Sequence, residues 1–254
     1  MNLLLHSPSN IVNPLARQRF MGFGTGSSGG GPAILPPVAG PDIWLDANRE
    51  SFANNDPVGQ FTDWSGNGNH FTSSGTARPT FKTGRINSRP TVQADGVDDG
   101  MILTSFASKT AWSLFYVGKL ITNTASNVLS VDDYGPDSIY YLWQYAGSNV
   151  GNVNANVSGI NQCSMTPGTT YAYALTGNGT TGTIRANDNT GGSVSANFSK
   201  ATAPMRLFRR GDGVYSNYEI AELLFYPSVL GTSDRSLIWS YFNTRYGTSI
   251  PATP

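Results

Sequence analysis

Glycine and proline interrupt this chain so often that little of it can form long helices. The 254 residues include 29 Gly and 15 Pro, and both residue types are unfavourable inside helices. Between them lie short segments rich in aromatic and β-branched residues, which favour strands. The 12 Tyr, 12 Phe and 5 Trp can fill a core, and a chain of this length can form one large β-sandwich. The sequence therefore predicts an all-β domain with a single core.

Two segments carry the clearest strand signals. In residues 112–120, apolar side chains alternate onto both faces, which predicts a strand buried in a sandwich. One face carries Trp112, Leu114, Tyr116 and Leu120, and the other carries Phe115 and Val117. Further along, residues 171–175 and 182–186 flank Gly177-Asn-Gly179, which predicts a β-hairpin and antiparallel pairing.

The C-terminal segment predicts one α-helix. Thr232 or Ser233 can cap its start, and Gly247 can end it. We expect its apolar side to pack on the sandwich, because an isolated helix of about a dozen residues is marginal in water. The residues at helical spacing are Leu237, Ile238, Tyr241 and Phe242.

The first 41 residues differ in composition from the rest. Residues 1–21 mix apolar and basic side chains without a strand or helix period, and residues 22–41 form a Gly/Pro-rich linker. We interpret residues 1–21 as a docking arm and residues 42–250 as the globular domain. The alternative is an arm without fixed structure or one that packs on its own domain. The candidate docking residues are Leu3, Leu4, Leu5, Ile11, Leu15 and Phe20.

Charge and cysteine content argue against several classes of protein. The formal net charge is +0, and the richest basic cluster is only Arg206, Arg209 and Arg210, so we expect no nucleic-acid partner. The apolar run at residues 3–5 is too short for a secretory signal or a membrane span, so we expect neither Sec export nor membrane insertion. The single Cys163 leaves no intrachain disulfide.

Four segments occur in an order that is typical of one domain family. They are Ile43-Trp-Leu-Asp-Ala47, Trp64-Ser-Gly-Asn-Gly-Asn-His70, Arg89-Pro-Thr-Val-Gln-Ala-Asp-Gly-Val-Asp-Asp99, and Ile220-Ala-Glu-Leu-Leu-Phe-Tyr226 followed by residues 230–247. They resemble the first strand, an Asn-Gly turn, a strand ending in an Asp-Gly turn, and the last strand and closing helix of the laminin G-like, concanavalin A-like lectin–glucanase family of bacteriophage and bacterial surface proteins.

The resemblance spans residues 42–247, with weak landmarks between 120 and 205. It implies a two-sheet jelly-roll β-sandwich with one C-terminal helix, preceded here by an extended N-terminal arm. It does not imply one activity, because this fold carries lectins, glycosidases, adhesion modules and passive virion parts.

Carboxylate spacing argues against catalysis. A retaining glycosidase needs two carboxyl groups about 5 to 5.5 Å apart on one side of the substrate. Glu219 and Glu222 are three residues apart in a strand-like segment, so we expect them on opposite faces. The Glu-x-Asp-x-Glu motif shared by glycosidases of this fold is absent, and Glu50 is the remaining glutamate. We therefore expect no enzyme and no catalytic residue, and interpret Glu222 as a carboxylate that fixes a strand or loop end.

Three aspartates form a candidate metal site. Asp95, Asp98 and Asp99 lie close together in a Gly-containing turn, and Ca²⁺ takes oxygen ligands from such loops. The alternative is an ordinary turn, in which Asp side chains bond nearby backbone N–H groups. His6 and His70 are too far apart in sequence to suggest a histidine metal site or a catalytic triad, and we interpret His70 as a turn residue. No cofactor besides Ca²⁺ is suggested.

The densest aromatic group is a candidate glycan site. It comprises Tyr134, Tyr140, Tyr141, Trp143 and Tyr145. At most half of such a group can face a ligand, because one face of a strand packs in the core. We select Tyr134 and Tyr140 as the candidate glycan-binding residues.

Together these features predict a structural protein of a tailed-phage virion, either a capsid decoration or a tail appendage. The arm would bind other virion proteins, and the jelly roll would face the medium and contact host-surface polysaccharide. We expect assembly in the host cytoplasm and consider a homo-oligomer, for example a trimer. The alternatives are an extracellular or cell-surface bacterial carbohydrate-binding or adhesion module and, less favoured, a glycoside hydrolase.

Overall fold

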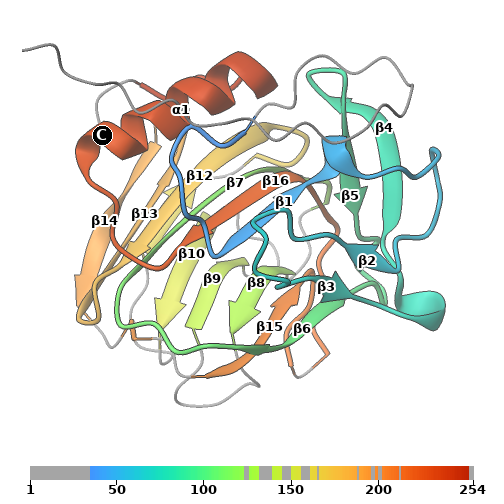
Figure 1. Ribbon diagram of the computed structural model, residues 1–254, viewed down its shortest axis with the longest axis horizontal. Helices are drawn as coiled ribbons and strands as arrows, with labels where there is room; N and C mark the ends of the chain where they lie inside the picture. Colours follow the sequence, from blue (N-terminus) through green and yellow to red (C-terminus); the bar gives the residue numbers. More distant parts are fainter. Residues whose placement is uncertain are drawn as a thin grey trace, which may run out of the picture. The chain divides into compact units, whose positions relative to one another are not determined.

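Two antiparallel sheets pack face to face in the part of the chain that the structure describes, which confirms the all-β prediction (Figure 1). In spatial order the first sheet contains β14 (Asn189–Ser195), β13 (Thr181–Ala186), β12 (Thr170–Gly177), β7 (Trp112–Leu120), β16 (Tyr218–Tyr226), β5 (Arg89–Gln93) and β4 (Thr80–Ile86), with β1 (Ile43–Asp46) also paired to β16. The second sheet contains β11 (Asn161–Ser164), β10 (Val150–Ala155), β9 (Ile139–Gln144), β8 (Ser126–Val131), β15 (Ala203–Leu207), β6 (Met101–Phe106), β3 (Phe71–Thr72) and β2 (Gln60–Phe61).

The computed structural model describes residues 35–122, 126–131, 139–144, 150–155, 161–164, 166–187, 189–195, 198–199, 202–211 and 213–251. For β8 to β11 this description covers the backbone alone. The chain divides into one unit of residues 1–35 and another of residues 36–254, and the sandwich belongs to the second. The predicted docking arm, with Leu3 to Leu5, Ile11, Leu15 and Phe20, and most of the predicted linker lie outside the described residues.

The main core lies between the sheets, and β7 shows how the sequence pattern produces it. Trp112, Leu114 and Tyr116 have no exposed surface and belong to the core cluster between the sheets. Phe115 and Val117 are equally buried but belong to a second cluster on the outer face of the first sheet. Both faces of β7 are therefore buried, as its alternating pattern predicts. Burying each such side chain contributes about 1.5 to 3 kcal/mol.

The predicted hairpin is confirmed. Strands β12 and β13 pair antiparallel, with Leu175 opposite Ile184. Between them, the side chain of Asn178 accepts hydrogen bonds from the N–H groups of Thr180 (3.1 Å) and Thr181 (2.7 Å). These bonds satisfy backbone donors at the tip of the turn.

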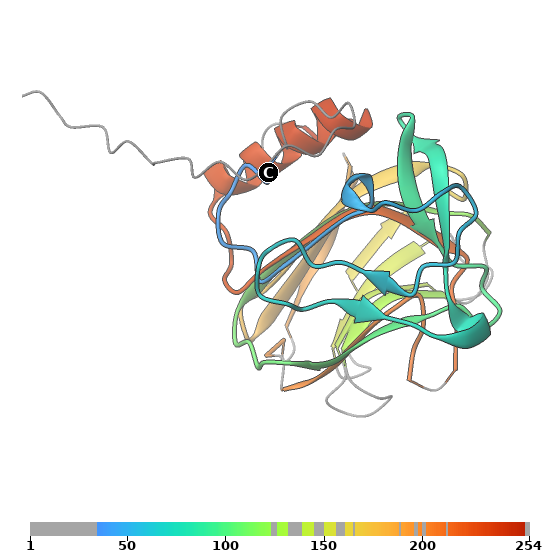
Figure 2. The same cartoon turned by 45° about the vertical axis from the view of Figure 1, so that its right-hand side comes forward.

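Helix α1 (Thr232–Tyr246) lies against the outer face of the first sheet (Figures 1 and 2). Gly247 ends it in the left-handed conformation at φ 66°, as predicted, but the N-cap is Gly231 in place of Thr232 or Ser233. The expected apolar stripe is also wrong at Leu237, whose side chain is 51% exposed. The buried apolar residues of the helix are Ile238, Trp239, Phe242 and Tyr246.

Short 3-10 helices complete the secondary structure of the described residues. They are η1 (Ala47–Arg49), which directly follows β1, and η2 (Gly75–Ala77). Among the described residues, no helix has the length and hydropathy needed to cross a membrane.

Candidate functional site

A β-bulge places two glutamates on the same face of β16. The pairing of β16 with β7 shifts register between Ile220 and Glu222, so that Ala221 is an extra residue. Ile220 and Leu223 both belong to the core between the sheets, whereas Ala221 belongs to the cluster beneath α1. Glu219 and Glu222 therefore both point outward, and the expectation that they lie on opposite faces is wrong. The period of two holds only along an unbroken strand.

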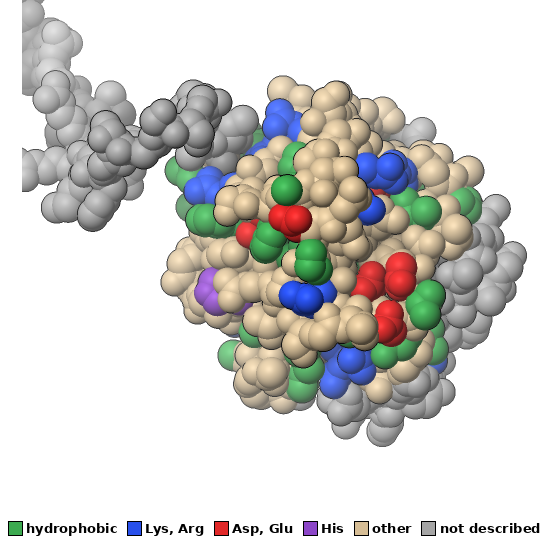
Figure 3. Space-filling view, turned by 90° about the vertical axis from the view of Figure 1, so that its right-hand side faces the viewer, with side chains coloured by type: hydrophobic (Ala, Val, Ile, Leu, Met, Phe, Trp, Pro, Cys, Tyr) green, Lys and Arg blue, Asp and Glu red, His purple; other side chains and the backbone are tan. Residues whose placement is uncertain are grey.

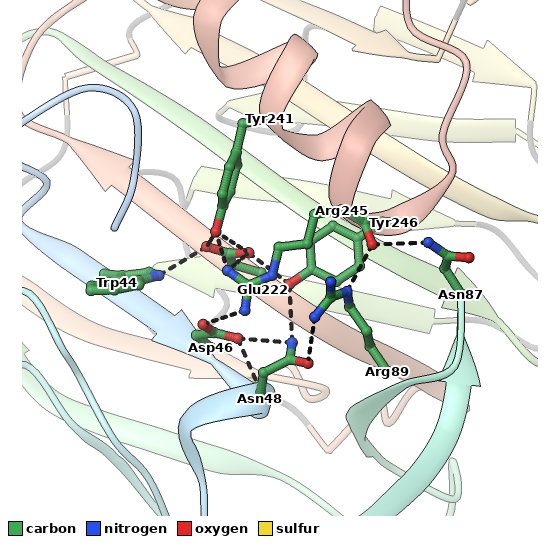
Figure 4. Close-up of polar contacts among 9 residues, drawn as sticks. All are labelled: Trp44, Asp46, Asn48, Asn87, Arg89, Glu222, Tyr241, Arg245 and Tyr246. Atoms are coloured by element: carbon green, nitrogen blue, oxygen red, sulfur yellow. Dashed lines mark hydrogen bonds and ion pairs between the residues drawn. The ribbon is translucent and has the colours of Figure 1, made fainter. Parts of the chain in front are cut away.

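Glu222 is fully buried beneath α1 and surrounded by donors (Figure 4). Its Oε1 accepts hydrogen bonds from Trp44 Nε1 and from the Tyr241 hydroxyl, each at 2.9 Å. Its Oε2 accepts one from the Tyr246 hydroxyl at 2.6 Å and lies 3.4 Å from Arg245 Nη1. The carboxylate thus joins β16 to β1 and to the last two turns of the helix.

A second buried carboxylate lies beside the first. Asp46 is the Cα partner of Glu222 across the β1–β16 ladder, and its Oδ2 is 2.7 Å from Arg245 Nη2. Its other oxygen accepts a hydrogen bond from the backbone N–H of Asn48 at 3.0 Å, which caps η1. We refer to Trp44, Asp46, Glu222, Tyr241, Arg245 and Tyr246 as the helix clamp.

Residues at the start of β5 and in the turn before it also form hydrogen bonds with the C-terminal end of α1. Asn87 Nδ2 and Arg89 Nε donate to the carbonyl oxygen of Arg245 at 3.0 and 2.8 Å (Figure 4). The last carbonyls of a helix lack partners within the helix, so these bonds satisfy one that would otherwise be orphaned. Arg89 Nη1 also donates to Asn48 Oδ1 at 3.3 Å, which ties the helix end to η1.

Burial favours the protonated form of Glu222 in the helix clamp. It raises the pKa of Glu222 from 4.5 to about 7, and the negative charge of Asp46 raises it further, while Arg245 and the hydrogen bonds from Tyr246 and Trp44 oppose the rise. A shifted carboxyl group is a frequent mark of an active site. Here, however, neither Glu222 nor Asp46 has exposed surface, so neither can touch a substrate in this conformation. The clamp positions the helix.

The other two glutamates also serve the protein's own structure. Glu219, with no exposed surface, accepts hydrogen bonds from Arg85 Nε and Thr91 Oγ1 at 3.0 Å and lies 2.7 Å from Lys119 Nζ. Glu50 accepts a hydrogen bond from the backbone N–H of Thr62 at 2.8 Å, and burial raises its pKa. All three glutamates of the chain are therefore engaged by neighbouring residues.

The three candidate metal ligands lie together, as their spacing predicts. The carboxylate oxygens of Asp95, Asp98 and Asp99 are within 4.8 Å of one another in the turn after β5. Acidic side chains gather in a patch on the face of the molecule that Figure 3 shows. A hard cation such as Ca²⁺ prefers oxygen donors of this kind, and these three residues could supply them.

Each carboxylate of this acidic turn also accepts a hydrogen bond from the protein. Asp95 accepts from the N–H of Val97 at 2.8 Å, Asp98 from Thr76 Oγ1 at 3.1 Å, and Asp99 from the N–H of Asp95 at 3.0 Å. Burial raises the pKa of Asp99 to about 6, and the charges of Asp95 and Asp98 add to the rise. These contacts suit an ordinary turn as well, so calcium binding here stays a prediction.

A small pocket lies beside the acidic turn. Its volume is about 150 Å³, and it is lined by hydroxyl-bearing residues of β3 and the segment after it, by Gly100 and Met101, and by Arg209. Sites for small-molecule ligands usually have volumes of about 300 to 1,000 Å³. The pocket is therefore too small to enclose a saccharide.

The turn between β2 and β3 is organised by one buried aspartate. Asp63 accepts hydrogen bonds at 2.9 Å from the N–H groups of Trp44, Ser65 and Asn69. The N–H of Asp63 in turn donates to His70 Nδ1 at 2.9 Å, so His70 is part of the turn. This fixed turn carries Trp64.

The side chains of both candidate glycan-binding residues lie outside the part of the chain that the structure describes. Tyr134 lies outside the described residues, and Tyr140 lies in β9, where the description covers the backbone alone.

One exposed aromatic residue, Trp64, was not predicted as a binding residue, because the sequence assigns it only to a turn motif. The available signal was its position before a Ser-Gly-Asn-Gly-Asn run, which keeps neighbouring side chains small.

Comparison with solved structures shows what this fold resembles. Trypanosoma rangeli sialidase in complex with 2,3-difluoro-KDN matches with a TM-score of 0.57 at 12% identity, over 85% of this chain and 34% of the sialidase chain. A GH54 α-L-arabinofuranosidase soaked with a cyclic sulfate inhibitor matches with a TM-score of 0.57 at 12% identity, over 82% of this chain and 60% of that chain. The similarity is consistent with a concanavalin A-like, lectin-type β-sandwich.

These matches concern the fold alone. This chain spans between about a third and three-fifths of the length of the two enzymes that it resembles. No family model matches the sequence, and no curated protein matches it either.

Proposed function

We propose that this chain is a non-catalytic structural protein of a tailed-phage virion, a capsid decoration or a tail appendage, whose laminin G-like sandwich contacts host-surface glycans. The main support for a non-catalytic role is that all three glutamates form hydrogen bonds with neighbouring residues of the chain. Glu219 and Glu222 have no exposed surface, and the Glu50 carboxylate is bonded to Thr62. Most glycosidases use a pair of Asp or Glu carboxyl groups that reach the substrate, and the glutamates of this chain are bonded within the protein instead.

The fold supports a saccharide as the class of ligand. The similar solved structures include the sialidase in complex with sialic acid and an arabinofuranosidase complexed with arabinofuranosyl-α-1,2-xylobiose. The chain resembles the β-sandwich regions of such carbohydrate-active proteins, while its own glutamates serve its structure. A module that binds glycans without cleaving them fits both observations. Incubation with polysaccharides should therefore release no reducing ends.

The composition of the N-terminal segment supports display from a particle. Residues 1–21 carry apolar and basic side chains, and the Gly/Pro-rich tract that follows can act as a spacer. The sandwich belongs to a separate unit of residues 36–254. In this proposal the arm binds another virion protein, while the sandwich reaches the medium.

Particle composition tests this proposal. We expect mass spectrometry of purified particles from a lysate of the source to find the chain at a fixed stoichiometry, and cryo-electron microscopy to locate it. A variant that lacks residues 1–21 should fold but no longer join the particle. Its incorporation at the full level would contradict the docking-arm model.

The lectin-type fold also favours a second candidate, an extracellular carbohydrate-binding or adhesion module of a bacterial surface. The same experiment separates the two, because such a module would be absent from particles and present in the medium or on cells.

A further inference from the structure

The exposed indole of Trp64 is supported from behind by a stack of side chains. The guanidinium carbon of Arg49 lies 4.7 Å from the centroid of the Trp64 ring and 4.6 Å from that of the Trp44 ring. Trp44 is only 3% exposed, and its Nε1 donates to Glu222 in the helix clamp. Arg49 therefore lies between a surface indole and a buried one, and the stack connects the surface to the core.

Hydrogen bonds of the backbone fix the turn that carries Trp64. The backbone N–H of Trp64 donates to the carbonyl oxygen of Trp44 at 2.7 Å. The neighbouring Asp63 holds the turn through three backbone N–H groups. The indole is thus held in place before any ligand arrives, which reduces the entropy lost on binding.

The position leaves one surface of the ring for a ligand. Trp64 is 37% exposed although Arg49 covers one of its faces. The residues that follow it, Ser65, Gly66 and Asn67, are small or polar, and Gly66 and Asn67 are exposed. A flat aromatic surface matches a sugar ring, whose C–H face packs on an aromatic ring. The Ser65 hydroxyl and the Asn67 amide beside the ring donate within the turn, to Asp63 and to the carbonyl oxygen of Pro41, so the stacking contact carries the match.

We propose that the exposed face of Trp64 is a stacking platform for a sugar ring of a polysaccharide. The inference rests on the proposed glycan-contacting function and specifies where contact occurs. A protein partner is the less favoured occupant, because the centre of a protein interface is a well-packed, fully desolvated pocket, whereas Trp64 stands beside exposed polar turn residues.

Affinity electrophoresis of the full chain tests the platform. The gels contain dextran, mannan, arabinoxylan or polysialic acid, and the variants are Trp64→Ala, Trp64→Phe and, as a control elsewhere on the surface, Leu237→Ala. We expect at least one polysaccharide to retard the wild-type chain. Trp64→Ala should weaken that affinity at least tenfold, Trp64→Phe should retain most of it, and Leu237→Ala should leave it unchanged.

The outcomes separate this inference from the proposed function. If a polysaccharide retards the wild-type chain and Trp64→Ala equally, the platform is wrong while the glycan-contacting function stands. If none of the four retards the wild-type chain, both are overturned.

Oxidation of the wild-type chain by N-bromosuccinimide provides a second readout that does not depend on the folding of a variant. Peptide mapping should show that a retained polysaccharide protects Trp64. Equal oxidation of Trp64 with and without the polysaccharide would overturn the platform.

Discussion

Asp46 and Glu222 lie directly opposite each other across the β1–β16 ladder, and a single guanidinium, that of Arg245, contacts both carboxylates. Two buried negative charges thus share one positive charge. Ionising both carboxylates leaves an uncompensated charge in a buried environment, which is costly. Protonation of Glu222 removes that charge. Burial of the carboxyl group and, after it, the negative charge of Asp46 raise the pKa of Glu222 to about 7.

This arrangement predicts that the folded state loses stability as the pH rises. The pKa of Glu222 is about 7 in the folded state and near 4.5 when the chain is unfolded, so the folded state holds the proton more tightly. The stabilisation is complete below pH 4.5 and is lost as the pH rises through 7. A shift of this size corresponds to about 3 kcal/mol in the free energy of unfolding.

Urea unfolding between pH 5 and 8 measures this effect. The Glu222→Gln variant is the control, because it cannot titrate at this position. We expect the stability of the wild-type chain to fall more steeply than that of the variant between pH 5 and 7, and the two curves to run parallel above about pH 8. Parallel curves between pH 5 and 7 would show that Glu222 does not titrate in this range.

Removing the shared cation should be more damaging than removing one hydroxyl group. Arg245→Met leaves two buried carboxylates without their ion-pair partner, and loss of one partner of a buried pair costs about 3 to 5 kcal/mol. Tyr241→Phe removes a hydroxyl that donates to Glu222 and accepts from Arg245 Nη1, and it should cost about 1 to 2 kcal/mol.

The control for charge is Arg78→Met, which removes an exposed guanidinium and should change stability by less than about 0.5 kcal/mol. Unfolding in urea at pH 6 gives all three values. Equal effects of Arg245→Met and Arg78→Met would contradict the clamp.

The sequence predicts where strands lie more reliably than it predicts on which face of the sheet a given side chain lies. Alternation in β7 identifies both of its buried faces, because the strand is regular. The same rule fails for Glu219 and Glu222, because the extra residue Ala221 is invisible in a pattern of polar and apolar letters. The three aspartates of the acidic turn are brought together by a local turn, so their spacing suffices to predict the cluster.

The clamp could not be predicted, because it depends on contacts between distant parts of the chain. Arg245 and Asp46 are 199 residues apart, and a basic residue in the last turn of a helix is usually read as an interaction with the helix dipole. Similarly, helical spacing alone selects Leu237, yet the sheet beneath the helix buries Trp239.

Strands β16 and β7 approach each other so closely at Gly118 that we expect a larger side chain there to destabilise the fold. A methyl group at Gly118 would place Cβ 2.5 Å from Tyr218 Cε1 and 2.6 Å from the carbonyl oxygen of Glu219. Because one of these neighbours is backbone, the strand pair must move, and Gly118→Ala should cost about 1 to 3 kcal/mol. Gly59→Ala, where the added Cβ would lie 3.9 Å from the nearest backbone atom, the carbonyl oxygen of Ser73, is the control and should be near neutral in thermal unfolding. Similar melting temperatures for both variants would contradict the packing of these strands.

The acidic turn predicts that calcium and protons compete for the same oxygens. The pKa of Asp99 is about 6, so the carboxyl group must lose its proton before a cation can use it. If Asp95, Asp98 and Asp99 bind Ca²⁺, the ion should stabilise the fold at pH 7.5 and much less at pH 5. At a concentration 100 times the dissociation constant, the gain is about 2.7 kcal/mol.

Thermal unfolding with 5 mM CaCl₂ or with EDTA tests this prediction, and the effect of one substitution depends on the answer. Without a cation, Asp99 lies near two other negative charges, so Asp99→Asn should stabilise the chain at pH 7.5 by relieving repulsion. With Ca²⁺ bound, the same substitution removes a ligand and should destabilise it. We expect destabilisation in CaCl₂, a smaller or opposite effect in EDTA, and no calcium-dependent change in the control Asp56→Asn, whose carboxylate caps a separate turn at Ala53. If Asp99→Asn raises the melting temperature equally in both solutions, the aspartates form a turn that binds no calcium.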